Sequence, residues 1–184
     1  MRRNAGFSLV ELMVAMVIGL IIILGAGQLF LTVFQTNRQV EALSEKQAAV
    51  NFAVETLLRD VRRASAVEKL GNSLRLTVPN RGDIDSGCTP NDLVDKEYRV
   101  SGLPVSAREG WALEVGLACS GETISNFAQV VAALDAGGES VGFKAEEVDG
   151  GVWLITLQLM ATGLDGTQDE LVFNAVNRTA AVTN

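Results

Sequence analysis

The chain has 184 residues, no histidine, two cysteines and a formal net charge of −7. The lack of histidine removes the commonest general base and the commonest metal ligand, and two cysteines alone cannot complete a structural zinc site. An acidic chain is also poorly suited to the phosphate backbone of nucleic acids. We therefore expect no enzymatic activity, no cofactor, no bound metal and no direct binding of nucleic acid.

A long apolar stretch runs from Gly6 to Phe34 near the N-terminus. The 23 residues from 12 to 34 carry no charge. As a helix they would extend about 35 Å, enough to cross a hydrocarbon core of about 30 Å. Glu11 is the one acid of the stretch, and Arg2 and Arg3 precede it. Basic residues before a membrane segment predict a cytoplasmic N-terminus, so the remainder of the chain is expected outside the inner membrane.

A secretory signal peptide is the first alternative for this stretch. Its apolar region would be only about 7–15 residues long, with an Ala-x-Ala-like cleavage site directly after it. Here the apolar region is longer, and Thr36-Asn37-Arg38-Gln39 follows it. The small-residue junction Ala5-Gly6 precedes the apolar region instead. Cleavage there would remove the basic leader and keep the membrane segment.

The sequence from Gly6 to Leu12, GFSLVEL, followed by about twenty apolar residues, resembles the type III signal of type IV prepilins and pseudopilins. The resemblance implies that a prepilin peptidase cleaves between Gly6 and Phe7 and that Phe7 is then N-methylated. It also implies that Glu11 pairs with the free amine of Phe7 in a neighbouring subunit when a filament assembles.

Ser8 and Glu11 also fit a capping box, in which the two side chains satisfy backbone N–H groups at the start of a helix. In that interpretation Glu11 serves only its own helix. An ionised acid costs about 2.5–3.5 kcal/mol at the centre of a bilayer and less near an end. Roughly sixteen strong hydrophobes at about 0.4 kcal/mol each outweigh this cost. Insertion is therefore favourable under both interpretations of Glu11.

The membrane segment contains Gly19, Gly25 and Gly27, and each costs about 1 kcal/mol relative to alanine inside a helix. They could be ordinary membrane glycines that permit close helix packing. They could also form a weak zone that unwinds locally when subunits pack in a filament. Many major pilins have a proline further along this segment, and its absence here argues against extensive unwinding.

Apolar residues between positions 35 and 67 recur every three or four residues, which predicts one helical face. They are Val40, Leu43, Val50, Val54, Leu57, Val61 and Ala64. Charged residues, Asp60 among them, are expected mostly off this face, and Gly71-Asn72 is expected to end the helix. With the membrane part this predicts one helix of about 60 residues. A coiled coil could produce the same face, but we favour packing on a sheet because strand-like segments follow.

The segment from Val50 to Arg63, VNFAVETLLRDVRR, is similar to the W-type minor pilins. The J-type pseudopilins of type II secretion carry a related Leu-x-Arg-Asp-Val/Leu-Arg pattern. The resemblance implies an inner-membrane protein that joins other minor pilins and the major pilin in pilus assembly, and through the pilus serves twitching motility, attachment or DNA uptake. The alternatives are a J-type minor pseudopilin and a membrane-anchored binding module that never enters a filament.

After Gly71 the pattern changes to alternating apolar residues and frequent turn residues, which predicts strands. The expected strands are Ser73–Pro79, Lys96–Ser101, Trp111–Cys119, Ser140–Val148, Val152–Thr162 and Glu170–Asn177. The segment Asn126–Ala136 is expected to be a short helix or irregular. Gly150-Gly151 predicts a hairpin turn. The strand after it is expected to be central, with Trp153, Ile155, Leu157 and Leu159 facing the helix.

The two cysteines, Cys88 and Cys119, both lie in the part expected outside the membrane. An even number of cysteines in that compartment predicts a disulfide. It would close a loop of about 30 residues and stabilise the fold by roughly 3.5 kcal/mol. The alternative is two unpaired buried thiols.

These elements predict an α+β fold, in which a long N-terminal helix packs on an antiparallel sheet as in type IV pilins. The expected organisation is a leader at 1–6, a transmembrane segment at 7–34, an amphipathic continuation of the helix at 35–70 and a periplasmic sheet domain at 71–184. In pilin terms, Asn72–Lys96 would connect the helix to the sheet, and the disulfide would tie that connection to the sheet.

Overall fold

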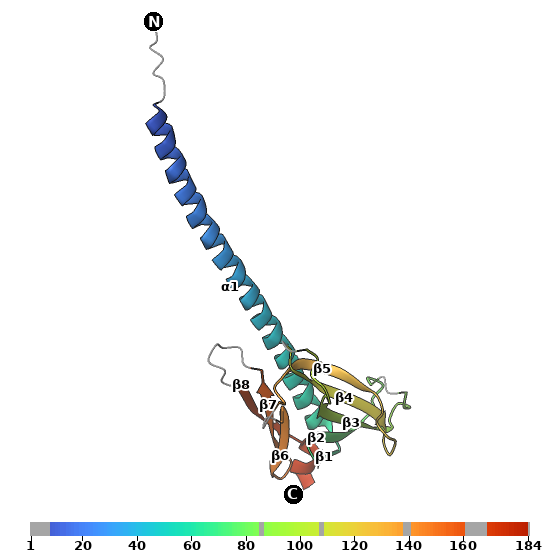
Figure 1. Ribbon diagram of the computed structural model, residues 1–184. Coiled ribbons are helices and arrows are strands. Elements are labelled where there is room, and N and C mark those ends of the chain that lie inside the picture. Colours follow the sequence, from blue (N-terminus) through green and yellow to red (C-terminus); the bar gives the residue numbers. More distant parts are fainter. Residues whose placement is uncertain (1–7, 85–86, 107–108, 138–140, 161–168, 184) are drawn as a thin grey trace. The chain divides into compact units, whose positions relative to one another are not determined.

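A computed structural model of the chain describes residues 8–84, 87–106, 109–137, 141–160 and 169–183. The chain divides into two compact units, Met1–Glu45 and Lys46–Asn184. Helix α1 (Leu9–Arg63) supplies the described part of the first unit and the start of the second (Figure 1). The other elements are β1 (Ala66–Leu70), β2 (Ser73–Pro79), β3 (Leu93–Val100), β4 (Trp111–Cys119), β5 (Phe127–Leu134), β6 (Phe143–Asp149), β7 (Val152–Leu159), β8 (Asp169–Val176) and α2 (Arg178–Thr183).

The first unit is an apolar helix whose side chains have no cover from the rest of the unit. Every large apolar side chain from Leu9 to Phe34 is at least 46% exposed. Among the described residues, α1 is the helix long and apolar enough to cross a membrane. Burial of one large apolar side chain is worth about 1.5–3 kcal/mol, so this surface strongly favours lipid or another apolar partner over water.

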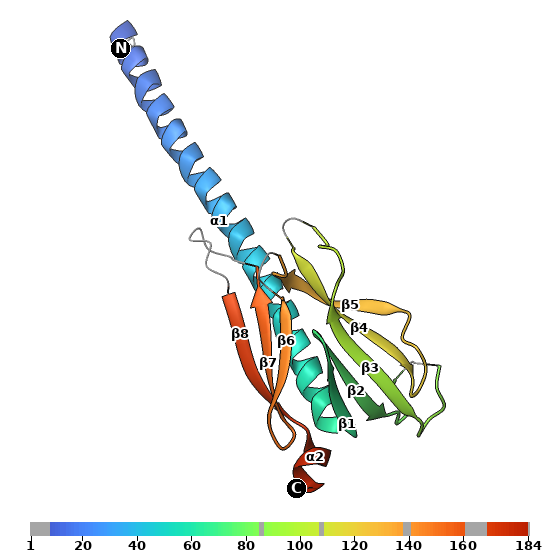
Figure 2. The same ribbon diagram turned by 60° about the horizontal axis from the view of Figure 1, so that its bottom comes forward.

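The second unit is built on one antiparallel sheet in the order β1-β2-β3-β4-β5-β7-β6, with β8 paired to β7. Strands β5 and β7 meet at one residue pair, Leu134 and Leu159. The sheet is therefore narrowest there, and it curls so that β1–β5 and β6–β8 flank the C-terminal part of α1 (Figure 2). This arrangement confirms the predicted α+β fold.

The C-terminal part of α1 buries the predicted apolar face in the core of the second unit. Leu57, Val61 and Ala64 are fully buried, and Val50 is 6% exposed. The core cluster joins them to residues of the strands, which is packing on a sheet as predicted. Asp60 was expected off this face, and that expectation is wrong because it is 3% exposed. It lies three residues after Leu57, on the edge of the buried face.

The predicted helical continuation to residue 70 is wrong in its last turns, because α1 ends at Arg63 and Ala66–Leu70 forms β1. The side chain of Asn177 caps the helix end by donating hydrogen bonds to the carbonyls of Val61 (3.1 Å) and Ala64 (2.9 Å). Carbonyls at a helix end have no partner within the helix. A residue more than 110 positions away therefore satisfies the end of α1, and the pairing of Ala66–Leu70 with β2 takes the following residues into the sheet.

Gly71 lies in the turn that joins β1 to β2, where its φ is 60°. The strands pair over five positions, from Ala66 with Thr77 to Leu70 with Ser73. A glycine at positive φ is equally suited to the end of a helix and to a tight hairpin. The sequence signal at Gly71 was correct for a reversal of the chain, but it did not say which element precedes the reversal.

Most predicted strands are confirmed, and β2 and β4 have the predicted bounds. The predicted hairpin at Gly150-Gly151 joins β6 to β7, and β7 lies between β6 and β8. Trp153, Ile155 and Leu157 of β7 are buried as expected. Because β2 belongs to the sheet, Asn72–Lys96 is not a connection outside it. Ala64 and Ser65 join α1 directly to β1, and the segment between β2 and β3 is a connection within the sheet.

The segment Asn126–Ala136 was expected to be a short helix or irregular, and this is wrong because Phe127–Leu134 forms β5. Its pairing with β4 contains register shifts between Trp111 and Ala112 and between Leu113 and Glu114. A bulge interrupts the alternation of inward and outward side chains. The period of two that identifies a strand in a sequence is therefore broken in this segment.

Candidate functional site

Glu11 lies in the first turn of α1 with its side chain exposed. The backbone N–H of Leu12 donates to the carbonyl of Ser8 at 3.2 Å, so the helix begins at this point. Within the described residues, neither Ser8 nor Glu11 makes a side-chain hydrogen bond or ion pair. The capping box is therefore not formed among the described residues.

Gly6 and Phe7, the other two residues of the predicted processing and assembly site, lie outside the described residues. Their cleavage, methylation and pairing with Glu11 stay predictions. One turn further along the helix surface the neighbours of Glu11 are apolar, namely Val14, which is 52% exposed, and Ala15. A carboxylate at a helix N-terminus gains about 0.3–1 kcal/mol from the helix dipole. This is less than the cost of placing the charge in lipid, so a cationic partner would stabilise it further.

The glycines of the membrane segment lie in continuous helix, because α1 is unbroken through Gly19, Gly25 and Gly27. A Cβ atom added at any of the three would meet nothing within 4 Å. No contact with the part of the chain that the structure describes therefore requires glycine at these positions. Close approach of a neighbouring helix would explain them. Local unwinding concerns the filament and stays a prediction.

In the second unit, Asp60 is the centre of a buried polar cluster that sequence analysis missed. Its Oδ2 accepts hydrogen bonds from Lys96 Nζ at 2.8 Å and from the Tyr98 hydroxyl at 2.7 Å. Arg63 Nε lies 3.7 Å from Oδ1. Burial and the adjacent Asp60 carboxylate raise the pKa of Tyr98 well above its usual value. The one available signal was an acid three residues after Leu57 in the apolar pattern.

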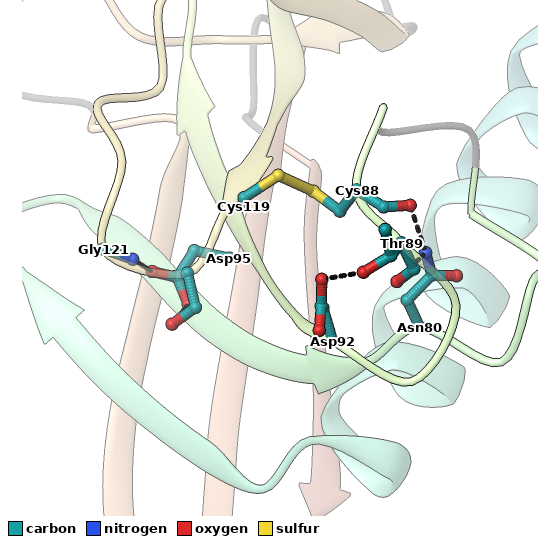
Figure 3. The surroundings of a disulfide bond; sticks show 8 residues. Asn80, Cys88, Thr89, Asp92, Asp95, Cys119 and Gly121 are labelled. Atoms are coloured by element: carbon teal, nitrogen blue, oxygen red, sulfur yellow. Dashed lines mark hydrogen bonds between the residues drawn. A yellow bond between two sulfur atoms is a disulfide. The ribbon is translucent and has the colours of Figure 1, made fainter.

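The predicted disulfide between Cys88 and Cys119 is confirmed, so the alternative of two unpaired thiols is excluded (Figure 3). Cys88 lies in the connection between β2 and β3, and Cys119 ends β4. Buried Asn80 donates from Nδ2 to the carbonyl of Cys88 at 3.3 Å. In the same connection, the Thr89 hydroxyl donates to the Asp92 carboxylate. The bridge therefore fastens the β2–β3 connection to β4, whereas the prediction had it fasten a connection between the helix and the sheet.

The comparison with family models matches the N-terminal part of the chain. A model described as the prokaryotic N-terminal methylation motif matches residues 1–27. Neither the search of curated proteins nor that of solved structures gave a match.

The matched segment includes Gly6, Phe7 and Glu11 and continues into the apolar helix. It supports a type IV prepilin-like protein, either a pilin or a pseudopilin. The motif implies processing by a prepilin peptidase and assembly with other pilins, and with the apolar helix it supports anchoring in a membrane.

Proposed function

We propose that the protein is a W-type minor pilin of a type IV pilus. The helix holds it in the inner membrane in a single pass, and the second unit lies in the periplasm. With other minor pilins it forms a small complex that primes assembly or caps the pilus tip. The observation that carries the assembly mechanism is Glu11, an exposed acid inside a methylation motif that has no partner among the described residues. The choice of the W type rests on the resemblance of the segment Val50–Arg63.

The proposed mechanism begins when the prepilin peptidase cleaves the bond between Gly6 and Phe7. Phe7 then carries a new terminal amine, which is N-methylated and keeps its positive charge. During assembly this amine of one subunit pairs with Glu11 of its neighbour. Two opposite charges 4 Å apart attract by about 1 kcal/mol in water and about 4 kcal/mol at an effective dielectric constant of 20. An apolar environment therefore turns this pair into a strong determinant of subunit register.

A J-type pseudopilin of type II secretion is the second candidate, because the pattern at residues 57–62 is common to both classes. Of its members, Leu57, Asp60 and Val61 are buried in the core of the second unit. Packing of α1 on the sheet is sufficient to explain why these three residues occur at these positions. The pattern consequently supports a pilin-like fold without choosing the filament, and partners must decide between the two systems.

Substitution of Glu11 tests the assembly mechanism. We expect Glu11→Ala to be processed and inserted normally but to abolish the protein's entry into filaments, because the amine of Phe7 loses its counter-charge. Glu41→Ala is the matched control, since Glu41 is an exposed acid further along the same helix. The measurement is the amount of protein in sheared filaments relative to membranes. Normal amounts for Glu11→Ala would refute the mechanism.

Mass spectrometry of the tagged protein and its co-purified partners tests whether the protein serves a type IV pilus or a type II secretion system. An N-methylated Phe7 together with minor pilins is the expected result. The same terminus with secretion pseudopilins would place the protein in a type II system and retain the mechanism. An intact Met1 without any pilin partner would leave α1 as an anchor only.

A further inference from the structure

The surface of the second unit has a hollow of about 540 Å³ lined with arginines. Three separate segments supply them: the last turns of α1, the β2–β3 connection and the start of α2, which lies beside the end of α1 (Figure 2). The arginines are Arg59, Arg62, Arg63, Arg81 and Arg178. We call this hollow the arginine groove.

Two of the five arginines already bind carboxylates of the same chain. Arg59 lies 2.8 Å from a carboxylate oxygen of Glu55, and Arg63 lies 2.6 Å from Asp83. The hydrogen bond from Arg63 lowers the pKa of Asp83, because the guanidinium stabilises the ionised carboxylate. The arginine groove therefore provides two internal examples of guanidinium–carboxylate pairing.

Among the described residues, the other three guanidinium groups have no such partner. Arg62, Arg81 and Arg178 are exposed, and no carboxylate of the described residues pairs with their side chains. The helix dipole favours a cation in the last turn of α1, which accounts for Arg62. It does not account for Arg81 and Arg178, because both belong to other segments. Three cations converge on one hollow although mutual repulsion opposes this arrangement.

The charge of the arginine groove is opposite to that of the rest of the protein. Five arginines, Glu55 and Asp83, the partner of Arg63, give the groove a formal charge of +3. Since the whole chain carries −7, the remainder carries −10. The net charge of the remainder repels a long polyanion such as a nucleic acid more than a short anionic ligand that lies within the groove.

We propose that the arginine groove binds a short acidic segment of another protein, one that presents at least two carboxylate side chains. The planar fork of a guanidinium matches a carboxylate in two parallel hydrogen bonds. Arg62, Arg81 and Arg178 supply these forks, while Arg59 and Arg63 keep their internal partners. The groove acts independently of Glu11 and lies in the other unit, so it does not depend on the proposed assembly mechanism.

The test measures binding of a fluorescent hexaglutamate peptide to the full-length protein in detergent micelles by fluorescence anisotropy. Hexaglutamine of the same length is the neutral control peptide. We expect hexaglutamate to bind and the triple variant R62Q/R81Q/R178Q to bind at least about tenfold more weakly, since three charge-assisted hydrogen-bonding groups are lost. The matched control K69Q/K144Q/R99Q removes the same charge outside the groove and should bind within about threefold of the native protein.

Equal binding by the native protein and the triple variant would overturn the proposal, as would equal losses in the triple variant and its control. An oligonucleotide is tested as the alternative ligand, because a nucleic acid is the other class of anionic macromolecule. If it binds to the arginine groove and hexaglutamate does not, the acidic-peptide proposal is wrong. Near-ultraviolet circular dichroism checks the fold. If the triple variant does not fold, R81Q and R178Q are measured singly, and each is expected to weaken binding.

Discussion

Helix α1 carries an acid near each of its ends, and the two acids have opposite surroundings. Glu11 is exposed on an apolar helix and has no side-chain partner in the described part of the chain. Asp60 is 3% exposed and accepts hydrogen bonds from Lys96 and Tyr98. The carboxylate near one end of the helix therefore binds partners within the chain, whereas the carboxylate near the other end has none among the described residues.

The apolar side chains of the two units differ in the same way. From Leu9 to Phe34 they are exposed, whereas Leu57 and Val61 are fully buried. Both parts have the same backbone hydrogen bonds, but most of the stability of a helix comes from packing of its apolar face, and only the second part finds its apolar partner in its own sheet. The first part must therefore find its partners in lipid or in other subunits.

The largest expected effect comes from removing the internally satisfied acid. Asp60→Ala should destabilise the second unit by about 3–5 kcal/mol, because Lys96 loses its buried counter-charge. The measurement is urea unfolding of the detergent-solubilised protein, followed by tryptophan fluorescence. Glu55→Ala is the control in the same helix, and loss of its exposed pair with Arg59 should cost less than about 1 kcal/mol. Similar losses in both variants would contradict the distinction between buried and exposed acids.

A leucine pair compares the apolar surfaces of the two units. Leu57→Ala should cost about 3 kcal/mol in the same unfolding experiment, because it leaves a cavity in the core. Leu43→Ala makes the identical chemical change at a residue that is 43% exposed and should change stability by less than about 0.5 kcal/mol. A large effect of Leu43→Ala on unfolding would mean that the first unit also stabilises the sheet.

The smallest expected effect is a dependence on alkaline pH that comes from Tyr98. The raised pKa of Tyr98 keeps its phenol protonated in the folded protein, whereas in the unfolded chain the phenol ionises at about pH 10. Above that pH the unfolded state binds fewer protons, so this tyrosine lowers stability by up to about 1.4 kcal/mol per pH unit. Below that pH the contribution is constant.

The chain has one tyrosine, so tyrosinate absorbance reports on Tyr98 alone. In urea we expect the tyrosinate absorbance to rise at about pH 10, the pKa of an unperturbed tyrosine. In the folded protein we expect no tyrosinate absorbance at that pH. Tyr98→Phe should lose its part of the alkaline slope. An ordinary titration in the folded protein would show that the hydroxyl is not held by Asp60.

The elements that sequence patterns predicted well are those whose signal is local. The apolar span needs only composition over about 20 residues, and β2 and β4 follow from alternation between turn residues. The disulfide followed from an even pair of cysteines in the external part. The prepilin motif likewise lies within a dozen residues of Gly6, and Glu11 was identified from it.

The errors fall where distant residues decide the outcome. The β4–β5 register shifts removed the alternation that would have identified β5. Asp60 reads as a surface acid until β3 brings Lys96 and Tyr98 beside it. The arginine groove was missed as well, because its arginines are spread from position 59 to position 178.

The sequence by itself determined an apolar anchor with a methylation motif and one lone acid, since lipid solubility and processing depend on contiguous residues. Only the tertiary structure decided that a strand follows α1, because Ala66–Leu70 pairs with β2 and Asn177, more than 110 residues on, caps the carbonyls at the helix end. It likewise decided which acid is buried and which arginines converge. Burial and electrostatic partnership depend on distance in space, and the linear order of residues carries that distance only over a few turns of helix or one hairpin.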